Sequence, residues 1–292
     1  MLGPTASGKS DVALRLAEDL GAEIISVDSM QVYRRMDIGT AKATLEERKR
    51  VRHHGLDLVE PSGVFSVAEY QQIGRAVMEN SSVPLVIVGG SGLHFRALVD
   101  PLRFRPHDAA LKTELEALSP EESVARLKVI DEMAAGHIDL ANPRRVTRAL
   151  EIAELTGETP SSRAVSEEQR SLDAYHPLFA FKAIALDPGP GLARRVTNRL
   201  KSMVDAGLVE EVAGLAAEMG RTARQAVGYK ELLPVVAGET SLAEGIEAAR
   251  RATLALVKRQ RTYFRRDPRL KWLTWSDDAD ERYRLAAAGL RS

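Results

Sequence analysis

Residues 3–10 read GPTASGKS, and this stretch decides the fold class. It completes the spacing G-x-x-x-x-G-K-[ST], the signature of a phosphate-binding loop. Its glycines let backbone N–H groups converge on phosphate oxygens at the positive end of a following helix. Lys9 adds a mobile charge, and the Ser10 hydroxyl suits Mg²⁺. We therefore expect a polyphosphate site formed by Gly3, Pro4, Thr5, Ala6, Ser7, Gly8, Lys9 and Ser10.

The phosphate loop is followed by a predicted helix but preceded by only two residues. A phosphate loop normally lies between a strand and a helix, and the helix is present: apolar residues recur at helical spacing up to Leu20, and the pattern stops at Gly21. Only Met1 and Leu2 precede the loop, which is too short for a strand of about five or six residues. We expect that the first strand is missing and that the native protein begins further upstream.

Four apolar runs predict buried strands, over residues 22–28, 83–88, 179–187 and 270–275. Helical patterns separate them, which indicates an α/β fold: a P-loop parallel sheet covered by helices on both faces. Residues 105–178 contain no such run, and Glu-, Ala- and Leu-rich segments alternate there with prolines. The predicted domains are a first part of the core over residues 1–104, an all-α insertion over 105–178, and a second part over 179–292 with a basic C-terminal helix.

Composition excludes several classes of protein. The 41 Lys and Arg residues balance 41 Asp and Glu residues, so a nucleic-acid partner would need a local basic surface. The chain has no cysteine, which rules out disulfides, thiolate metal sites and a cysteine nucleophile. It has no run of 18 apolar residues and no signal peptide pattern. We expect a cytoplasmic protein that has no membrane partner and is a monomer.

Asp28 is the acidic candidate for the phosphate site. In a parallel sheet the carboxyl ends of the strands line the ligand crevice, so Asp28 and residues 89–91 should face the bound phosphate. The first interpretation of such a loop is an ATPase or a small-molecule kinase. Those enzymes often have an apolar strand that ends in an acidic Mg²⁺ ligand, whereas the run over 83–88 ends in glycines. Capping the strand end or supporting Mg²⁺ indirectly are other possible roles of Asp28.

A helix near the C-terminus separates charge from apolar surface. On a helical wheel its basic residues share about half the circumference, and no acidic residue lies between Arg250 and Arg266. The basic positions are Arg251, Lys258, Arg259, Arg261, Arg265 and Arg266. The positions expected to face the core are Ala249, Ala252, Leu256, Tyr263 and Phe264. A merely solvated face would mix both signs of charge, so we predict nucleic-acid contact, in particular by Lys258, Arg259 and Arg265.

Eight blocks of the sequence resemble the tRNA dimethylallyltransferase family, in the family's order. They are GPTASGKS, ISVDSMQVYRRMDIGTAK, HHGLDLVEP, FSVAEYQ, VIVGGSGLH, NPRRVTRALEI, QAVGYKEL and KRQRTYFRR, between residues 3 and 266. The resemblance implies transfer of a dimethylallyl group from dimethylallyl diphosphate to N6 of the adenosine 3′-adjacent to the anticodon of tRNA, with release of diphosphate. It also implies Mg²⁺ as the cofactor and the tRNA anticodon stem-loop as the partner.

The resemblance further implies roles for single residues. Asp28 would accept the proton that the adenine amine loses. Lys9, with Mg²⁺ near Ser10, would stabilise the leaving diphosphate. Ser91 stands where the family usually has a Thr that contacts the reacting groups, and His94 stands at a usual Tyr, where we expect a packing residue. Gln31 should read a base edge through its amide. The implied tRNA contacts are Asp28, Ser29, Met30, Gln31, Lys112, Arg144, Arg145 and Arg148.

Three other functions remain open on the sequence. They are a kinase of a small metabolite or nucleotide, a prenyltransferase acting on free adenine nucleotides, and a non-catalytic RNA-binding protein. The predicted basic surfaces argue against the first two, because neither substrate needs them. The intact phosphate loop argues against the third.

Overall fold

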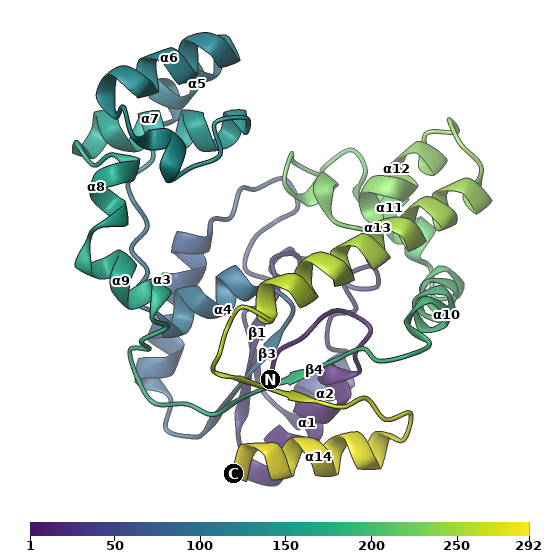
Figure 1. The fold of residues 1–292 in the computed structure, drawn as a ribbon. Coiled ribbons are helices and arrows are strands. Elements are labelled where there is room, and N and C mark those ends of the chain that lie inside the picture. The colour runs from purple at the N-terminus through teal and green to yellow at the C-terminus, as the bar shows by residue number, and fades with distance from the viewer. Residues whose placement is uncertain (292) are drawn as a thin grey trace. The chain divides into compact units, whose positions relative to one another are not determined.

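Five short strands form the centre of the structure (Figure 1), a computed structural model that describes residues 1–291. Strand β1 (Glu23–Val27) lies between β2 (His53–His54) and β3 (Leu85–Gly89). Strand β4 (Ala183–Leu186) pairs with β5 (Leu270–Leu273). Every one of these pairings is parallel. The predicted parallel sheet is confirmed, and four of its strands fall within the predicted runs or one residue beyond them.

Leu2 joins the two groups of strands. It forms parallel bridges with Gly89 at the end of β3 and with Ala185 in β4. Its N–H donates to the carbonyl of Ile184 at 2.9 Å, and its carbonyl accepts from the N–H of Leu186 at 3.0 Å. The short segment before the phosphate loop therefore lies between β3 and β4, at the position where the sequence pattern requires a strand.

Helices cover both faces of the strands in the unit formed by Met1–Val99 and Phe179–Ser292. Their bounds are α1 (Lys9–Leu20), α2 (Leu45–Arg50), α3 (Val67–Asn80), α4 (Gly92–Val99), α10 (Leu192–Asp205), α11 (Leu208–Leu215), α12 (Tyr229–Val236), α13 (Leu242–Phe264) and α14 (Ala279–Arg291), with a 3₁₀ turn at Ala223–Gln225. Local signals set their ends: Ser66 and Ser241 begin α3 and α13 with capping boxes, and Gly21 ends α1 in the left-handed conformation.

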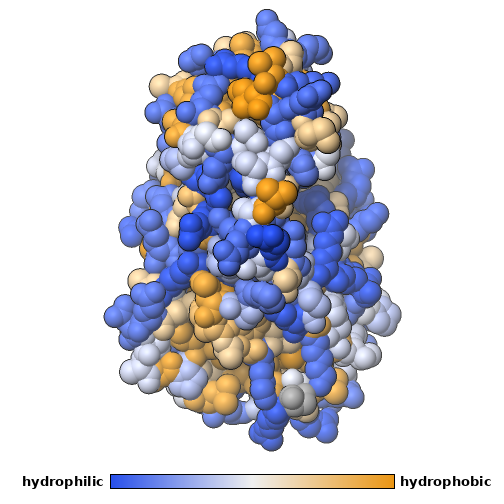
Figure 2. All heavy atoms as spheres, turned by 60° about the vertical axis from the view of Figure 1, so that its left-hand side comes forward, coloured by the Kyte–Doolittle hydropathy of each residue, from blue (hydrophilic) through white to orange (hydrophobic). Residues whose placement is uncertain are grey.

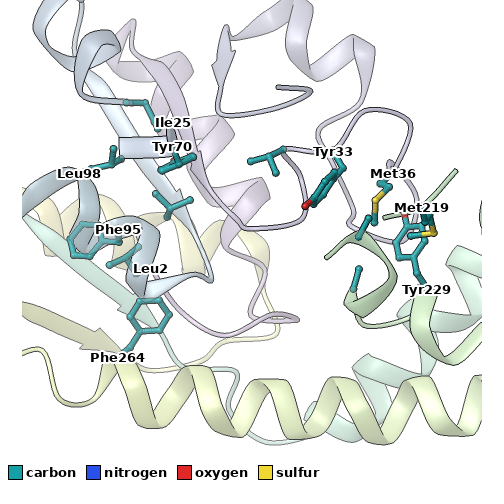
Figure 3. Packing of buried hydrophobic residues seen from close by; sticks show 14 of the residues in the cluster. Leu2, Ile25, Tyr33, Met36, Tyr70, Phe95, Leu98, Met219, Tyr229 and Phe264 are labelled. Atoms are coloured by element: carbon teal, nitrogen blue, oxygen red, sulfur yellow. The ribbon is translucent and has the colours of Figure 1, made fainter. Parts of the chain in front are cut away.

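Alternate residues of the strands enter two different cores. Ile24, Val86 and Val88 pack with the buried side chains of α1 and with Ala286 of α14. Ile25 and Val27 point to the other face, because successive strand side chains alternate. There they join Leu2, Phe95 of α4 and Phe264 of α13 in a second cluster (Figure 3). The strands thus hold the phosphate loop and the carboxyl end of β1 at one edge, between two layers of helices.

Residues Asp100–Leu178 form a separate compact unit. It contains α5 (Ala109–Glu116), α6 (Pro120–Ile130), α7 (Pro143–Thr156), α8 (Pro160–Ala164), α9 (Glu167–Asp173) and a 3₁₀ turn at Ala134–Gly136. Three of the prolines occupy the first position of α6, α7 and α8, where the missing N–H costs no helix hydrogen bond. Its core contains Leu115, Leu127, Val146 and Leu150. No β-strand is assigned within this range.

Three details differ from the sequence prediction. The two-residue strand β2 was not expected, because it lacks an apolar run and is recognisable only from its pairing with β1. Helix α14, which follows the predicted strand β5, was not expected. Tyr263, expected to face the core, is 37% exposed, whereas Val257 on the same helix is buried.

No helix suited to crossing a membrane is found in the part of the chain that the structure describes. No helix between residues 1 and 291 combines the length and the apolar character that a bilayer crossing needs. On the face drawn in Figure 2, hydrophilic side chains predominate and the hydrophobic ones form small patches.

Leu2 should make an unusually large contribution to stability for a residue next to a loop. Its side chain is fully buried, so Leu2→Ala should lower the free energy of unfolding by about 2–5 kcal/mol. Urea denaturation followed by circular dichroism measures this. Leu20→Ala is the matched control, because Leu20 is 54% exposed and its loss should cost about 0.5 kcal/mol or less. Equal effects of the two substitutions would contradict the placement of Leu2 in the core.

Candidate active site

The phosphate loop is a tight turn between Leu2 and α1. Gly3 and Gly8 adopt positive φ angles of 143° and 69°, and a Cβ at Gly3 would lie 2.6 Å from the carbonyl oxygen of Leu186. Gly8 precedes the first residue of α1, so the unpaired N–H groups of the first helical turn point toward the loop. Lys9 reaches back across it, and its Nζ donates to the Pro4 carbonyl at 3.1 Å.

A cavity of about 1040 Å³ opens at this edge of the strands. Its wall brings together residues that lie far apart in the sequence. They include Lys9 and Ser10 at the loop, Asp28 after β1, Gly89 and Gly90 at the end of β3, Arg199 of α10 and Gln260 of α13. The volume is that of a small-molecule site. The predicted loop and acidic residue therefore do face one common cavity.

Of the charged side chains that line this cavity, Lys9, Arg199 and Asp28 interact with one another near the phosphate loop. The pKa of Lys9 is lowered to about 8, mainly by burial and also by the neighbouring Arg199, while Asp28 opposes the shift. Burial also lowers the pKa of Arg199, although Asp28 and Asp11 act in the opposite direction. Two cations held partly out of water are costly without a bound anion, so the part of the wall around Lys9 and Arg199 suits an anionic ligand.

Arg199 was missed by the sequence analysis. It lies on α10 beside the buried apolar residues Val196 and Leu200. An arginine adjacent to the apolar face of an amphipathic helix was the available signal, but this pattern is equally common at ordinary helix boundaries. Only the packing of α10 shows that Arg199 faces the cavity rather than solvent.

Asp28 is held by the turn that follows β1. Its Oδ1 accepts from the N–H of Met30 at 2.8 Å and, more weakly, from that of Gln31 at 3.4 Å. Among residues 1–291, no hydrogen-bond donor is recorded for its Oδ2. Asp28 thus has a fixed carboxylate with one oxygen available at the cavity wall.

The Gln31 amide is already engaged inside the protein. Its Oε1 accepts from the Ser26 hydroxyl at 2.7 Å, and its Nε2 donates to the carbonyls of Thr40 and Ala41 at 3.1 and 3.2 Å. The sequence-based expectation that this amide reads a base edge therefore conflicts with its observed partners. Gln31 lines the cavity, but its amide is hydrogen-bonded to the backbone of residues 40–41. Met30 also lines the cavity, whereas Ser29 does not.

Ser91 lies beside the end of β1 without forming part of the cavity wall. Its N–H donates to the Val27 carbonyl at 3.0 Å, and its Oγ lies 2.7 Å from Nδ1 of His94. His94 is buried, and burial lowers its pKa to about 4, so the ring is neutral near pH 7. It packs edge-on against Tyr70, with ring centroids 4.7 Å apart. His94 is thus a packing residue, as expected, and it also holds the Ser91 hydroxyl.

The basic surface of α13 is only partly free. Arg261 and Arg265 both pair with Asp187, at 2.7 and 3.3 Å, and Arg265 also lies over the ring of Trp272. Lys258 and Arg259 are exposed and have no recorded partner among residues 1–291. These two residues, rather than Arg265, are the side chains most available to a polyanion.

The basic residues of the helical insertion likewise divide into exposed side chains and side chains that are bonded within the protein. Arg144 and Arg145 are exposed in the first turn of α7, with no recorded side-chain partner in the described chain. Arg148 instead donates to the carbonyls of Arg105 and Pro106, each at 2.9 Å, and pairs with Glu151. Lys112 lies 3.8 Å from Glu116. The expected contact of Arg148 with tRNA therefore competes with its role in holding the insertion together.

The fold and the site define an α/β phosphate-loop protein with a small-molecule anion site and exposed basic surfaces. A sequence model of the family described as IPP transferase matches residues 31–267. The tRNA dimethylallyltransferase of Moorella thermoacetica is 44% identical over 306 residues, which cover 99% of this chain and 92% of that protein. The chain belongs to this family.

Solved structures agree with the sequence relationship. The full-length tRNA isopentenylpyrophosphate transferase of Bacillus halodurans superposes with a TM-score of 0.70 at 34% identity, covering 99% of this chain and 95% of that one. A eukaryotic dimethylallyltransferase acting on tRNA has a TM-score of 0.80 at 24% identity, covering 96% of this chain and 76% of that one. The second similarity concerns the fold alone.

The lowered pKa of Lys9 predicts a pH-dependent affinity for diphosphate ligands. Lys9 is charged below about pH 8, and a bound anion stabilises the charged form, so affinity should be full below that pH and fall as Lys9 loses its proton above it. Phosphate groups complete their own ionisation near pH 6. Titrating dimethylallyl diphosphate between pH 7 and about pH 9.5 should therefore show the Kd rising by up to about tenfold per pH unit above the Lys9 pKa. Lys9→Met should bind weakly with little change across the same range. A wild-type Kd that stays constant would contradict the assignment.

Proposed function

We propose that this protein transfers a dimethylallyl group from dimethylallyl diphosphate to N6 of the adenosine 3′-adjacent to the anticodon of tRNA, and releases diphosphate. The observation that carries the proposal is the common cavity. Its wall contains the phosphate loop, the cations Lys9 and Arg199 near that loop, and Asp28, whose carboxylate has an available oxygen. The curated relatives bear the name tRNA dimethylallyltransferase, which identifies the group that the diphosphate carries.

The cations act on the leaving group. As the allylic C–O bond breaks, negative charge grows on the diphosphate, and groups that already point there stabilise it without reorganising. Lys9 and Arg199 face the cavity, and the first N–H groups of α1 are free of partners within the helix. The partial burial of both cations strengthens their attraction for the diphosphate, because water screens less there.

Asp28 acts on the nucleophile. The exocyclic amine of adenine is a weak nucleophile that must lose a proton when its new C–N bond forms. The available Oδ2 of Asp28 accepts that proton, a contribution typically worth about 10²–10⁴-fold in rate. Oδ1 stays bound to the Met30 N–H, which keeps the carboxylate in place. Extraction of the adenosine from the stacked anticodon loop brings its amine to this wall.

Mg²⁺ fits the donors on the loop side. The Ser10 hydroxyl is exposed, lines the cavity and has no recorded partner among the described residues. Over residues 1–291 no cluster of three or more His, Cys, Asp or Glu side chains could hold a metal ion alone. This suits Mg²⁺, which usually binds few protein ligands and takes phosphate oxygens and water for the rest. When bound, the ion would neutralise charge on the diphosphate.

The tRNA binds to exposed basic side chains. Lys258 and Arg259 on α13 supply one surface, and Arg144 and Arg145 on α7 supply another. Phosphate contacts of this kind give affinity and orientation but no sequence readout. We further propose that the protein works as a monomer in the cytoplasm, where its tRNA substrate is present.

A nucleoside assay tests the function and the role of Asp28 together. The wild type, dimethylallyl diphosphate, Mg²⁺ and unmodified tRNA should yield prenylated adenosine, identified by mass after digestion. Asp28→Asn keeps the size of the side chain but removes the basic carboxylate, so turnover should fall by roughly 10²-fold or more while affinity for dimethylallyl diphosphate changes little. Asp205→Asn, at an exposed residue with no recorded partner in the described chain, should behave as the wild type. Consumption of ATP to phosphorylate a small molecule would identify a kinase instead, and near-normal turnover of Asp28→Asn would exclude Asp28 as the base.

The basic surface of α13 predicts a salt-dependent defect. Replacing Lys258 and Arg259 by Ala should weaken tRNA binding for every tRNA sequence. The slope of log affinity against log salt should shrink by roughly 0.7–0.9 for each tRNA phosphate that the protein no longer neutralises. Lys201→Ala removes an exposed charge from α10 and serves as the control. An unchanged slope in the double variant would show that this surface does not bind phosphate.

A further inference from the structure

Gln260 of α13 bridges two loops of the cavity wall. The N–H of Thr5 in the phosphate loop donates to its Oε1 at 2.9 Å. Its Nε2 donates to the carbonyl of Gly90 at 3.0 Å. Both ends of one side-chain amide are therefore used, one as acceptor and one as donor. These partners also fix which end of the amide is which.

One of the two loops holds the leaving diphosphate, and the other adjoins the proposed base. Thr5 lies in the loop that holds the diphosphate. Gly90 precedes Ser91, whose N–H bonds to the carbonyl of Val27, the residue before Asp28. Gln260 thus connects the leaving-group side of the cavity to the side that carries the base.

The backbone contacts nearby join the strand segments rather than the two loops themselves. Between β3 and the segment that enters the phosphate loop, they are the bridge from Leu2 to Gly89, a bond of 2.6 Å from the Met1 amino group to the Ile87 carbonyl, and a weaker one, at 3.3 Å, from the Gly89 N–H to the Met1 carbonyl. Gly90 fits this arrangement because it has no side chain: a Cβ there would lie 2.4 Å from Nε2 of Gln260. The close approach requires glycine at one partner and a side-chain amide at the other.

We propose that Gln260 is a positioning residue that fixes the distance between the phosphate loop and the Gly89–Ser91 turn. The inference rests on the proposed function for its effect on catalysis. Binding of either substrate depends mainly on other groups, whereas the transfer step needs the allylic carbon and the adenine amine in attack geometry. A displacement of about 1 Å can cost roughly 10²-fold in rate. The loss of Gln260 should therefore lower kcat more than it changes either KM.

The test replaces the amide by a side chain of similar length. Gln260→Met loses both hydrogen bonds, and kcat at saturating substrates should fall by about ten- to a hundredfold, with the KM for tRNA within about threefold of wild type. Thr262→Val, at an exposed position of the same helix with no recorded partner in the described chain, is the matched control. Gly90→Ala is a second, milder variant, because its Cβ displaces the amide without removing it. Thermal unfolding of each variant separates loss of stability from loss of kcat.

Hydrogen exchange keeps the inference distinct from the proposed function. The Thr5 amide should exchange at least about tenfold faster in Gln260→Met than in the wild type and the control, because its acceptor is gone. This holds whether or not the protein transfers a prenyl group. A wild type without transferase activity would overturn the proposed function, and the exchange rate would then decide the inference. Unchanged exchange at Thr5 would overturn the positioning role of Gln260. So would a kcat of folded Gln260→Met and Gly90→Ala within twofold of wild type.

Discussion

The placement of the phosphate loop between a strand position and a helix start is the constraint on which the rest of the structure depends. Leu2 supplies the strand position, since it bridges β3 and β4, and Gly8 turns directly into α1. With these two points fixed, Lys9 and Ser10 must face the carboxyl ends of β1 and β3, because parallel strands end at one edge. The cavity lies at that edge, and Arg199 of α10 and Gln260 of α13 form part of its wall.

The chemistry that we propose depends on charged groups that meet at that cavity. Lys9 and Arg199 lie near the loop and Asp28 follows β1, so one pocket would hold both groups that stabilise a departing anion and a proton acceptor for an incoming amine. The neutral His94 fits this arrangement, because a pKa near 4 makes it a poor proton acceptor at neutral pH. This is consistent with Asp28 as the proton acceptor that we propose. Hydrogen bonds within the chain hold Lys9 and Asp28 in place.

The sequence predicts the structural features that a short local pattern encodes. It does not predict the features that arise only when distant segments pack together. The loop motif, the apolar runs and the position of Asp28 at a strand end predict the sheet and one wall of the cavity. Strand β2 has no apolar pattern and exists only through its partner β1. Arg199 and Gln260 resemble ordinary helix residues until α10 and α13 pack against the loop. Conversely, Gln31 and Arg148 resemble ligands for tRNA, but hydrogen bonds within the chain already engage their side chains.

We propose that this phosphate loop holds a prenyl diphosphate as a group donor rather than ATP as a phosphoryl donor. Equilibrium titration of one protein preparation with dimethylallyl diphosphate and with ATP, both in the presence of Mg²⁺, tests it most directly. We expect dimethylallyl diphosphate to bind at least about tenfold more tightly than ATP, a difference of about 1.4 kcal/mol, and to displace any bound ATP. Tighter binding of ATP, which dimethylallyl diphosphate fails to displace, would contradict it.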